Sequence, residues 1–290
     1  MKTTKLFTVI FACAAVLLAG CTKNKGGDDM PEYTITVTAG ANGSAGATVG
    51  GAAVTKAPAG AVVTLTATAD NDHAFDKWTV TAVGATITLD DAANPATFTM
   101  PAADVTVKAE FVDLRVTING VVWATRNVDA FRTFAASPES FGMFYQWNRV
   151  KAWPSTGSVT GWENSVPTGD SWTAANDPCP TGWRVPIKAE LDILFAAGVT
   201  HVWTDNFNDT GVKGYKFTDN TSTASIFFPA VNFREHTDGT LTTSGNGGYY
   251  WSATSYLEIG AWHMAFGTGH YAQNGTNRSY GFSVRCVRQQ

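Results

Sequence analysis

Apolar and polar residues alternate along much of the chain after its first thirty positions. The alternation is clearest in Tyr33–Thr38, Val62–Ala67 and Val105–Phe111. A period of two puts one set of side chains on the buried face of a β-strand. Clusters of Gly, Asn, Asp and Pro separate these stretches and predict turns, and no stretch between them has sustained helical spacing. Residues 33–112 are therefore predicted to form a small all-β module.

The rest of the chain, residues 113–290, combines such strands with one helix. Lys188–Ala197 is rich in helix formers, places Leu191, Leu194 and Phe195 on one face, and is followed by a glycine that predicts a stop. Val116–Ala124 predicts two short strands around an Asn-Gly turn, and further strands are predicted at 214–217 and 225–230. This pattern predicts a β-rich α+β module.

Two stretches near the C-terminus, Ala261–Phe266 and Tyr280–Cys286, also alternate. Bulky apolar residues take every second position of the first stretch, so His263 and Ala265 are predicted to face outward. The segment between them, residues 267–279, is polar and rich in Gly and Asn. The pattern predicts a buried hairpin that displays a polar loop.

The N-terminus has the pattern of a secretion signal. A basic start, Met1–Lys5, precedes the apolar run Leu6–Gly20, which is of signal-peptide length. The run ends in Leu-Ala-Gly-Cys, which looks like a bacterial lipobox; the alternative is an ordinary signal peptide in which Cys21 is incidental. We expect residues 1–20 to be removed, Cys21 to carry lipid in the outer membrane, and residues 21–32 to form a tether. The side of the membrane that the protein faces is left open.

Composition agrees with an extracytoplasmic protein. The chain is 44% hydrophobic and only 15% charged, a mixture that suits β-rich extracytoplasmic folds. Its net charge is −4, and removal of residues 1–20 takes away two lysines and no acidic residue, which leaves −6. No basic stripe is present, so nucleic acid is not an expected partner.

The four cysteines divide by location. Cys13 leaves with the signal and Cys21 takes the lipid, so Cys179 and Cys286 remain. Two cysteines in an oxidising compartment most simply form one disulfide. A metal site is not expected, because no His or Cys lies at ligand spacing from either residue.

Two motifs of the first module point to a family. These are Phe-Asp-Lys-Trp at 75–78 and the stretch Ala96–Val107, which contains Phe-Thr-Met followed by Ala-Asp-Val-Thr-Val. They resemble the divergent internalin B-repeat modules of bacterial surface proteins. The resemblance implies a β-grasp-like spacer without a catalytic role, in which Trp78 and Phe98 belong to the core.

The second module carries five motifs in order. They are WATRNV at 123–128, YQWN at 145–148, DPCPTGWRVP at 177–186, YYWSAT at 249–254 and YGFSVRCVR at 280–288. Together they look like the Fibrobacter succinogenes major paralogous domain family, which is related in fold to C-type lectin-like proteins and to formylglycine-generating enzymes. The resemblance implies a β-rich α+β, C-type lectin-like domain in which Cys179–Cys286 ties the loop before the helix to the last strand.

No catalytic residue, metal or cofactor is predicted. The formylglycine-generating branch uses a reactive cysteine pair near its C-terminus, but this chain has only Cys286 there. The tripeptides of the lectin calcium site are missing, and Asp205, Asp209 and Asp219 are more simply turn formers than calcium ligands. Histidine and serine residues lack the spacing of known catalytic motifs.

The lectin-like resemblance instead implies a ligand surface built from loops near the C-terminal hairpin. Aromatic faces with amide and guanidinium donors suit a glycan or a protein. The alternative is that this loop is merely solvated and that Trp251 and Trp262 are merely core. The residues that carry over are Tyr256, Leu257, Glu258, Ile259, His263, Ala265, Thr268, His270, Tyr271, Gln273, Asn274, Asn277 and Arg278.

These observations predict an adhesin-like envelope lipoprotein that binds a glycan or protein without catalysis. The alternative function is a structural or tip subunit of a fimbria-like assembly, in which the same surface contacts another subunit. An envelope enzyme is the third candidate, and the sequence shows no acid, base or nucleophile constellation for it.

Overall fold

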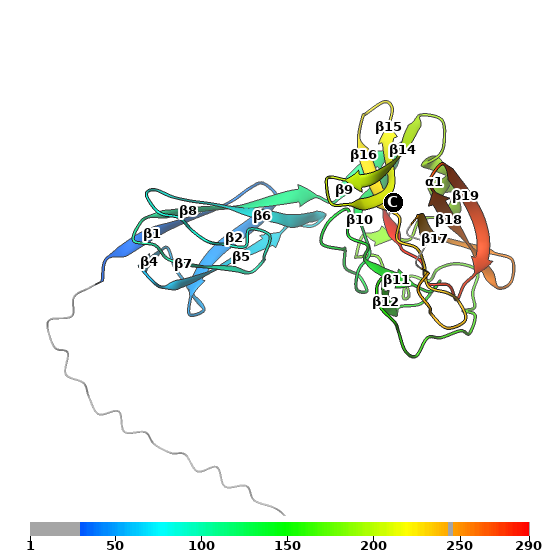
Figure 1. Ribbon diagram of the computed structural model, residues 1–290, viewed down its shortest axis with the longest axis horizontal. Helices are drawn as coiled ribbons and strands as arrows, with labels where there is room; N and C mark the ends of the chain where they lie inside the picture. Colours follow the sequence, from blue (N-terminus) through cyan, green and yellow to red (C-terminus); the bar gives the residue numbers. More distant parts are fainter. Residues whose placement is uncertain (1–29, 243–245, 290) are drawn as a thin grey trace, which may run out of the picture.

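The computed structural model describes residues 30–242 and 246–289. Two modules follow one another and give an elongated molecule (Figure 1). The predicted signal peptide, Cys21 and residues 21–29 of the tether lie outside the described residues. Within these limits, no helix has both the length and the apolar character needed to cross a membrane.

The N-terminal module is a pair of four-stranded sheets, which confirms the all-β prediction. Strands β1 and β8 pair in parallel, and the other pairs are antiparallel. The first sheet contains, in order, β4 (Lys56–Pro58), β1 (Glu32–Ala39), β8 (Val105–Asp113) and β6 (His73–Ala82). The second contains β3 (Ala52–Ala53), β2 (Gly43–Val49), β5 (Val62–Ala69) and β7 (Ala96–Thr99).

Alternation of side chains explains how these two sheets pack. In β5, Val63, Leu65 and Ala67 are buried while their neighbours face outward or are half-buried. These residues share one apolar cluster with residues of the first sheet. Trp78 and Phe98 belong to the same core, as predicted.

The C-terminal module contains several small sheets and one short helix. A four-stranded sheet consists of β13 (Trp183–Arg184), β20 (Arg285–Arg288), β10 (Val121–Asn127) and β9 (Arg115–Ile118). A three-stranded sheet consists of β14 (Val199–Phe207), β15 (Val212–Asp219) and β16 (Ser225–Pro229). Another consists of β17 (Gly247–Tyr256), β18 (Gly260–Gly267) and β19 (His270–Asn277), and β11 (Met143–Tyr145) pairs with β12 (Ala152–Pro154).

The predicted Asn-Gly turn and helix are both present. Asn119 and Gly120 have φ values of 46° and 83°, the left-handed conformation that a two-residue hairpin turn requires. The helix α1 (Lys188–Ile193) is shorter than predicted, and it buries Leu191. The chain turns after it, and Phe195 stacks on Tyr271 with ring centroids 3.7 Å apart. The helix therefore ends at Ile193, although the helix-forming residues continue to Ala197, because the residues after it pack against other parts of the module.

The predicted C-terminal hairpin is wrong. Strand β18 covers the first predicted stretch, but its partners are β17 and β19, and β20 pairs with β10 and β13 instead. The predicted loop at 267–279 is largely the strand β19. Polar side chains did not prevent a strand here, because β18 supplies hydrogen-bond partners for one side of the β19 backbone.

Cys179 and Cys286 form the predicted disulfide, with Cα atoms 6.0 Å apart. Both residues are buried in an aromatic cluster of the C-terminal module. The bond ties the segment before α1 to strand β20, as the family resemblance implied.

The turn at Asp72 of the N-terminal module contacts the C-terminal module. Only Leu114 separates β8 from β9. The Asp72 carboxylate accepts hydrogen bonds from the Trp183 indole, at 3.2 Å, and from the Arg288 guanidinium, and Arg115 lies 3.8 Å away. The Leu114 amide donates to the Asp72 carbonyl oxygen. This junction joins the modules end to end along the long axis of the molecule (Figure 1).

Candidate functional site

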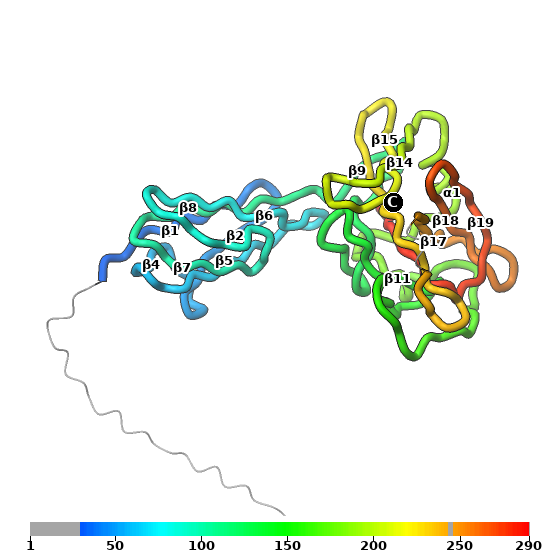
Figure 2. The backbone as a smooth tube through the Cα atoms, in the orientation of Figure 1, coloured from blue at the N-terminus to red at the C-terminus, as the bar shows by residue number. Residues whose placement is uncertain are grey.

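The turn between β17 and β18 exposes large apolar side chains. Leu257 is 78% exposed and Ile259 is 58% exposed, and Ile187, just before α1, is 46% exposed. Tyr256 and Trp262 stand beside them and are partly exposed. We call these five residues together with Glu258 the distal tip, because the β17–β18 turn, orange in Figure 2, lies on the side away from the N-terminal module. Such grouped apolar exposure marks interaction sites on soluble proteins.

Aromatic contacts fix the shape of the distal tip. The Tyr256 ring meets the edge of Trp262 at a centroid distance of 4.8 Å. Gly275 of β19 makes room for Tyr256, because a Cβ atom there would overlap the ring. The Lys188 ammonium lies 4.9 Å from the Trp262 ring centroid and occupies that face. The tip therefore consists of residues from β17, β18, the turn between them and the position before α1, and it contacts Lys188 of α1 and Gly275 of β19.

Arg278 supports the tip from below and is not available to a ligand, which corrects its predicted role. Its side chain is fully buried, with Nε donating to the Gly260 carbonyl at 2.8 Å and Nη1 to the Pro167 carbonyl at 3.0 Å. Its guanidinium lies over the Trp147 ring at 4.4 Å. Burial lowers the pKa of Arg278. Arg278 thus ties the tip to residues 155–182, the long irregular segment between β12 and β13 that contains Pro167.

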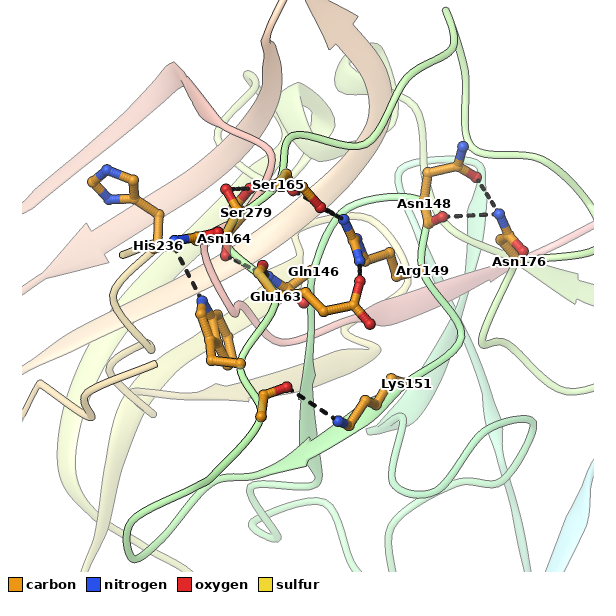
Figure 3. Close-up of polar contacts among 12 residues, drawn as sticks. Gln146, Asn148, Arg149, Lys151, Glu163, Asn164, Ser165, Asn176, His236 and Ser279 are labelled. Carbon is orange, nitrogen blue, oxygen red and sulfur yellow. Dashed lines mark hydrogen bonds and ion pairs between the residues drawn. The ribbon is translucent and has the colours of Figure 1, made fainter. Parts of the chain in front are cut away.

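Side-chain hydrogen bonds hold that irregular segment against the module (Figure 3). Gln146 donates to the carbonyls of Glu163 and Ser279, and Arg149 pairs with Glu163 and donates to Ser165. The segment contains no helix or strand that could satisfy its own backbone groups. These polar side chains do so instead and give the tip a fixed base.

His263 was predicted to face outward, and the structure shows that this is wrong. It is 6% exposed and lies among Trp251, Phe282 and Tyr249. This burial lowers the pKa of His263 to about 4. Period-two alternation identified the two faces of β18, but the face that was predicted to be exposed is covered at His263 by Trp251 and Phe282.

The other predicted residues fall into separate groups. Asn277 pairs with Gly260 beside the tip. Thr268 and His270 are exposed at the opposite end of β18 and β19, and Tyr271 there is partly covered by its stack on Phe195. The remaining three differ in exposure: Asn274 is exposed, Ala265 is half-buried, and the side-chain amide of Gln273 is buried.

Of the acidic residues considered for calcium, Asp219 acts as a turn former, whereas Asp205 lies in strand β14. The Asp219 carboxylate accepts hydrogen bonds from the amides of Asn119, Thr221 and Ser222, which lower the pKa of Asp219. Asp205 accepts from the Trp203 indole. Over the described ranges, no group of three or more His, Cys, Asp or Glu residues is placed to hold a metal ion.

Sequence reasoning missed Ile187 and Lys188 as parts of the site. They lie about seventy positions before the tip turn, and no local pattern links them to it. Two backbone-linked contacts bring them there: the Lys188 amide donates to the Thr254 hydroxyl, and the Ala253 amide donates to the Pro186 carbonyl. Tyr256, Leu257, Glu258 and Ile259 were found through the lectin-like resemblance, which implied no residue near position 187.

Comparison with protein families agrees with the two modules. Residues 33–114 match the divergent InlB B-repeat domain, and residues 116–288 match the Fibrobacter succinogenes major domain. No curated protein and no solved structure matches the chain. Because the second match spans more than half of the sequence and its boundary falls at the junction next to Leu114, the chain belongs to the Fibrobacter succinogenes major domain family, here preceded by a divergent InlB B-repeat domain.

Proposed function

We propose that the protein is a lipid-anchored, adhesin-like binding module of the bacterial cell envelope that engages a protein ligand through the distal tip. The exposed Leu257 and Ile259 carry this proposal, because large apolar side chains at the outer end of an elongated molecule cost solubility unless they bind. Both matched domains are surface-type modules, which supports an extracellular role.

The chemistry of the tip favours a protein over a glycan. Glycan sites present open aromatic faces beside oriented polar groups. Here Lys188 occupies one face of Trp262, and Leu257 and Ile259 form the outermost surface. An apolar centre with a Tyr and a Trp beside it and a charged rim, supplied by Glu258 and Lys188, is the usual anatomy of a protein–protein hot spot.

The expected anchor gives this tip a direction. A lipid on Cys21 would hold the N-terminal module near the membrane. The distal tip lies on the side of the C-terminal module that faces away from the N-terminal module. The N-terminal module then acts as a spacer, and we place the protein at the outer membrane with the tip pointing away from it.

Binding screens of the mature chain test this function. Wild type and Leu257→Ser/Ile259→Ser are compared on an array of extracellular proteins and on a glycan array. We expect protein ligands whose binding the tip variant loses by about tenfold or more, as for a hot-spot pair. Thr268→Ala/His270→Ala, at the other end of the same sheet, is the matched control and should bind as wild type. Equal binding by wild type and the tip variant, or binding to glycans alone, contradicts the proposal.

A structural subunit of a surface assembly is the second candidate function. The observation that favours it is the outer edge of β19, which pairs with no strand among residues 30–242 and 246–289 and could join another strand. Crosslinking in intact cells separates the two: an assembly yields ladders of this chain with other subunits, whereas the binding module yields crosslinks to a ligand through the tip.

A further inference from the structure

Strands at the edge of a sheet present unpaired backbone groups, and natural proteins protect them with charges, prolines, bulges or short length. The N-terminal module follows this rule. Its edge strand β6 has a bulge between Phe75 and Lys77, and the Trp78 amide is capped by the Asp91 carbonyl. Strand β4 is short and contains a lysine and a proline, β3 has two residues, and β7 lies between Pro95 and Pro101.

Most edges of the C-terminal module are protected in the same ways. Strand β14 has a bulge between Thr204 and Phe207, and within it Asp205 is exposed and pairs with Lys213 at 3.6 Å. Strand β17 is bridged on its outer side to Asn232 and Ser283. The edge strands β12 and β16 are short and end in proline, and β13 has two residues.

Strand β19 has none of these protections. It is eight residues long, contains no charged residue and no proline, and pairs with β18 in a continuous register without a bulge. Its outer side pairs with no other strand in the part of the chain that the structure describes. Figure 1 shows β19 at the outer border of the C-terminal module. A long, regular and neutral edge of this kind is a template for another strand.

The chemistry of β19 fits a second copy of itself. An isologous contact requires a surface that is complementary to itself. A neutral strand meets no like charge when it pairs with its own copy, whereas a charged foreign strand would find no opposite charge here. The exposed side-chain amide of Asn274 both donates and accepts hydrogen bonds, so it can pair with the same residue of a second copy.

We propose that β19 is the edge through which two copies of this chain associate, antiparallel, into one continuous six-stranded sheet. A two-fold axis perpendicular to the sheet keeps each face on the same side in both copies, so residues on the exposed face of one β19 oppose residues on that face of the other. This contact uses the backbone edge of β19 and stands independently of the ligand of the distal tip.

Sedimentation equilibrium of the full mature chain in density-matched detergent tests the proposal. Wild type is expected to be a dimer, and Asn274→Lys, at an exposed position of β19, is expected to raise the dimer dissociation constant by about tenfold or more by placing like charges at the pairing edge. Val202→Lys, at a 56% exposed position of the edge strand β14, is the matched control and should stay dimeric. Asn274→Asp, close to isosteric, should weaken the dimer in the same direction.

Folding of each variant is checked by its far-ultraviolet spectrum and by formation of the Cys179–Cys286 disulfide. A folded wild type that stays monomeric at its highest soluble concentration overturns the proposal. So does a dimer that neither Asn274 variant weakens, a dimer that Val202→Lys also breaks, or a wild type found only as a heteromer with a different chain. A dimer weakened by both Asn274 variants and not by Val202→Lys supports it.

Discussion

The two modules differ in how their buried backbone groups find hydrogen-bond partners. Among the described residues, every buried polar or charged side chain lies in the C-terminal module. The N-terminal module pairs its backbone within two sheets and fills the space between them with apolar side chains. The C-terminal module has long irregular segments, and buried arginines such as Arg234 and Arg278 bind their carbonyl groups. Irregular surface architecture therefore depends on specific long-range polar contacts, whereas a sandwich depends on alternation.

Removal of the disulfide should give the largest difference in stability between the two modules. Only the C-terminal module contains cysteines among residues 33–290. Cys179→Ala/Cys286→Ala should lower its free energy of unfolding by about 4.7 kcal/mol, the chain-entropy value for a loop of about 100 residues. Hydrogen exchange resolved by peptide should show faster exchange in the C-terminal module and little change in the N-terminal one. An equal loss of protection in both modules would contradict the comparison.

Removal of one buried arginine should have the next largest effect. The fully buried Arg234 donates to the carbonyls of Pro154, Thr156, Gly157 and Gly239, at 2.7 to 3.0 Å. Arg234→Met leaves these groups without their donor and should cost about 3 to 4 kcal/mol in urea unfolding.

The matched control for that variant is Arg132→Met, at an exposed guanidinium of the same module. It should change the free energy of unfolding by less than about 0.5 kcal/mol. A similar effect of both substitutions would show that the carbonyl contacts of Arg234 are not what stabilises the irregular segments.

Acid should weaken the C-terminal module through His263. Its pKa is lowered from 6.5 to about 4 in the folded chain by burial. Between these values the unfolded chain binds a proton that the folded chain does not, so the free energy of unfolding falls as the pH drops from about 6.5 to about 4. The full loss is about 3 kcal/mol at most.

The difference between wild type and His263→Gln isolates this contribution from that of other titrating groups. Urea unfolding across pH 4 to 7 should show a steeper loss for wild type than for the variant. His270→Gln, at an exposed histidine on the neighbouring strand, is the control and should retain the wild-type slope. Parallel curves for wild type and His263→Gln would rule out His263 as the source of the acid sensitivity.

The junction offers the smallest and most local test. Asp72→Ala removes the acceptor for Trp183 and Arg288 and should cost about 1 to 2 kcal/mol. It should also let the modules move, which small-angle scattering would detect as a broader distribution of distances. Asp70→Ala, an exposed residue of the same turn, is the control and should leave the scattering unchanged. Unchanged scattering for Asp72→Ala would mean that the short connection through Leu114 alone fixes the arrangement.

The sequence predicted the N-terminal module well because its structure is local. Alternation identified the strands around Val63 and Val107, and both residues are buried in the shared core. Alternation did not identify the pairing of those strands, because it specifies which side chains share a face and not which strand lies alongside.

The candidate site was only partly predictable for the same reason. Leu257 and Ile259 were implied by the lectin-like resemblance, but Ile187 and Lys188 joined them only through the packing of α1 against β17. Arg278 looked like a ligand residue because a guanidinium in a polar segment usually faces solvent. Its burial follows from carbonyl groups of Gly260 and Pro167, which lie far from one another in the sequence.

By itself, the sequence determined the two modules, the all-β character of the first, the helix face with Leu191 and the Cys179–Cys286 pair. The periodicity and the motifs are local patterns of sequence, and the cysteine pair follows from the number of cysteines that remain. None of these depends on how distant segments pack. Only the tertiary structure decided that β18 lies between β17 and β19, that His263 is buried and that β19 is an edge. The physical reason is that the burial of a strand's second face depends on the residues that pack on it. Those residues, such as Phe282, lie outside the sheet of β17, β18 and β19.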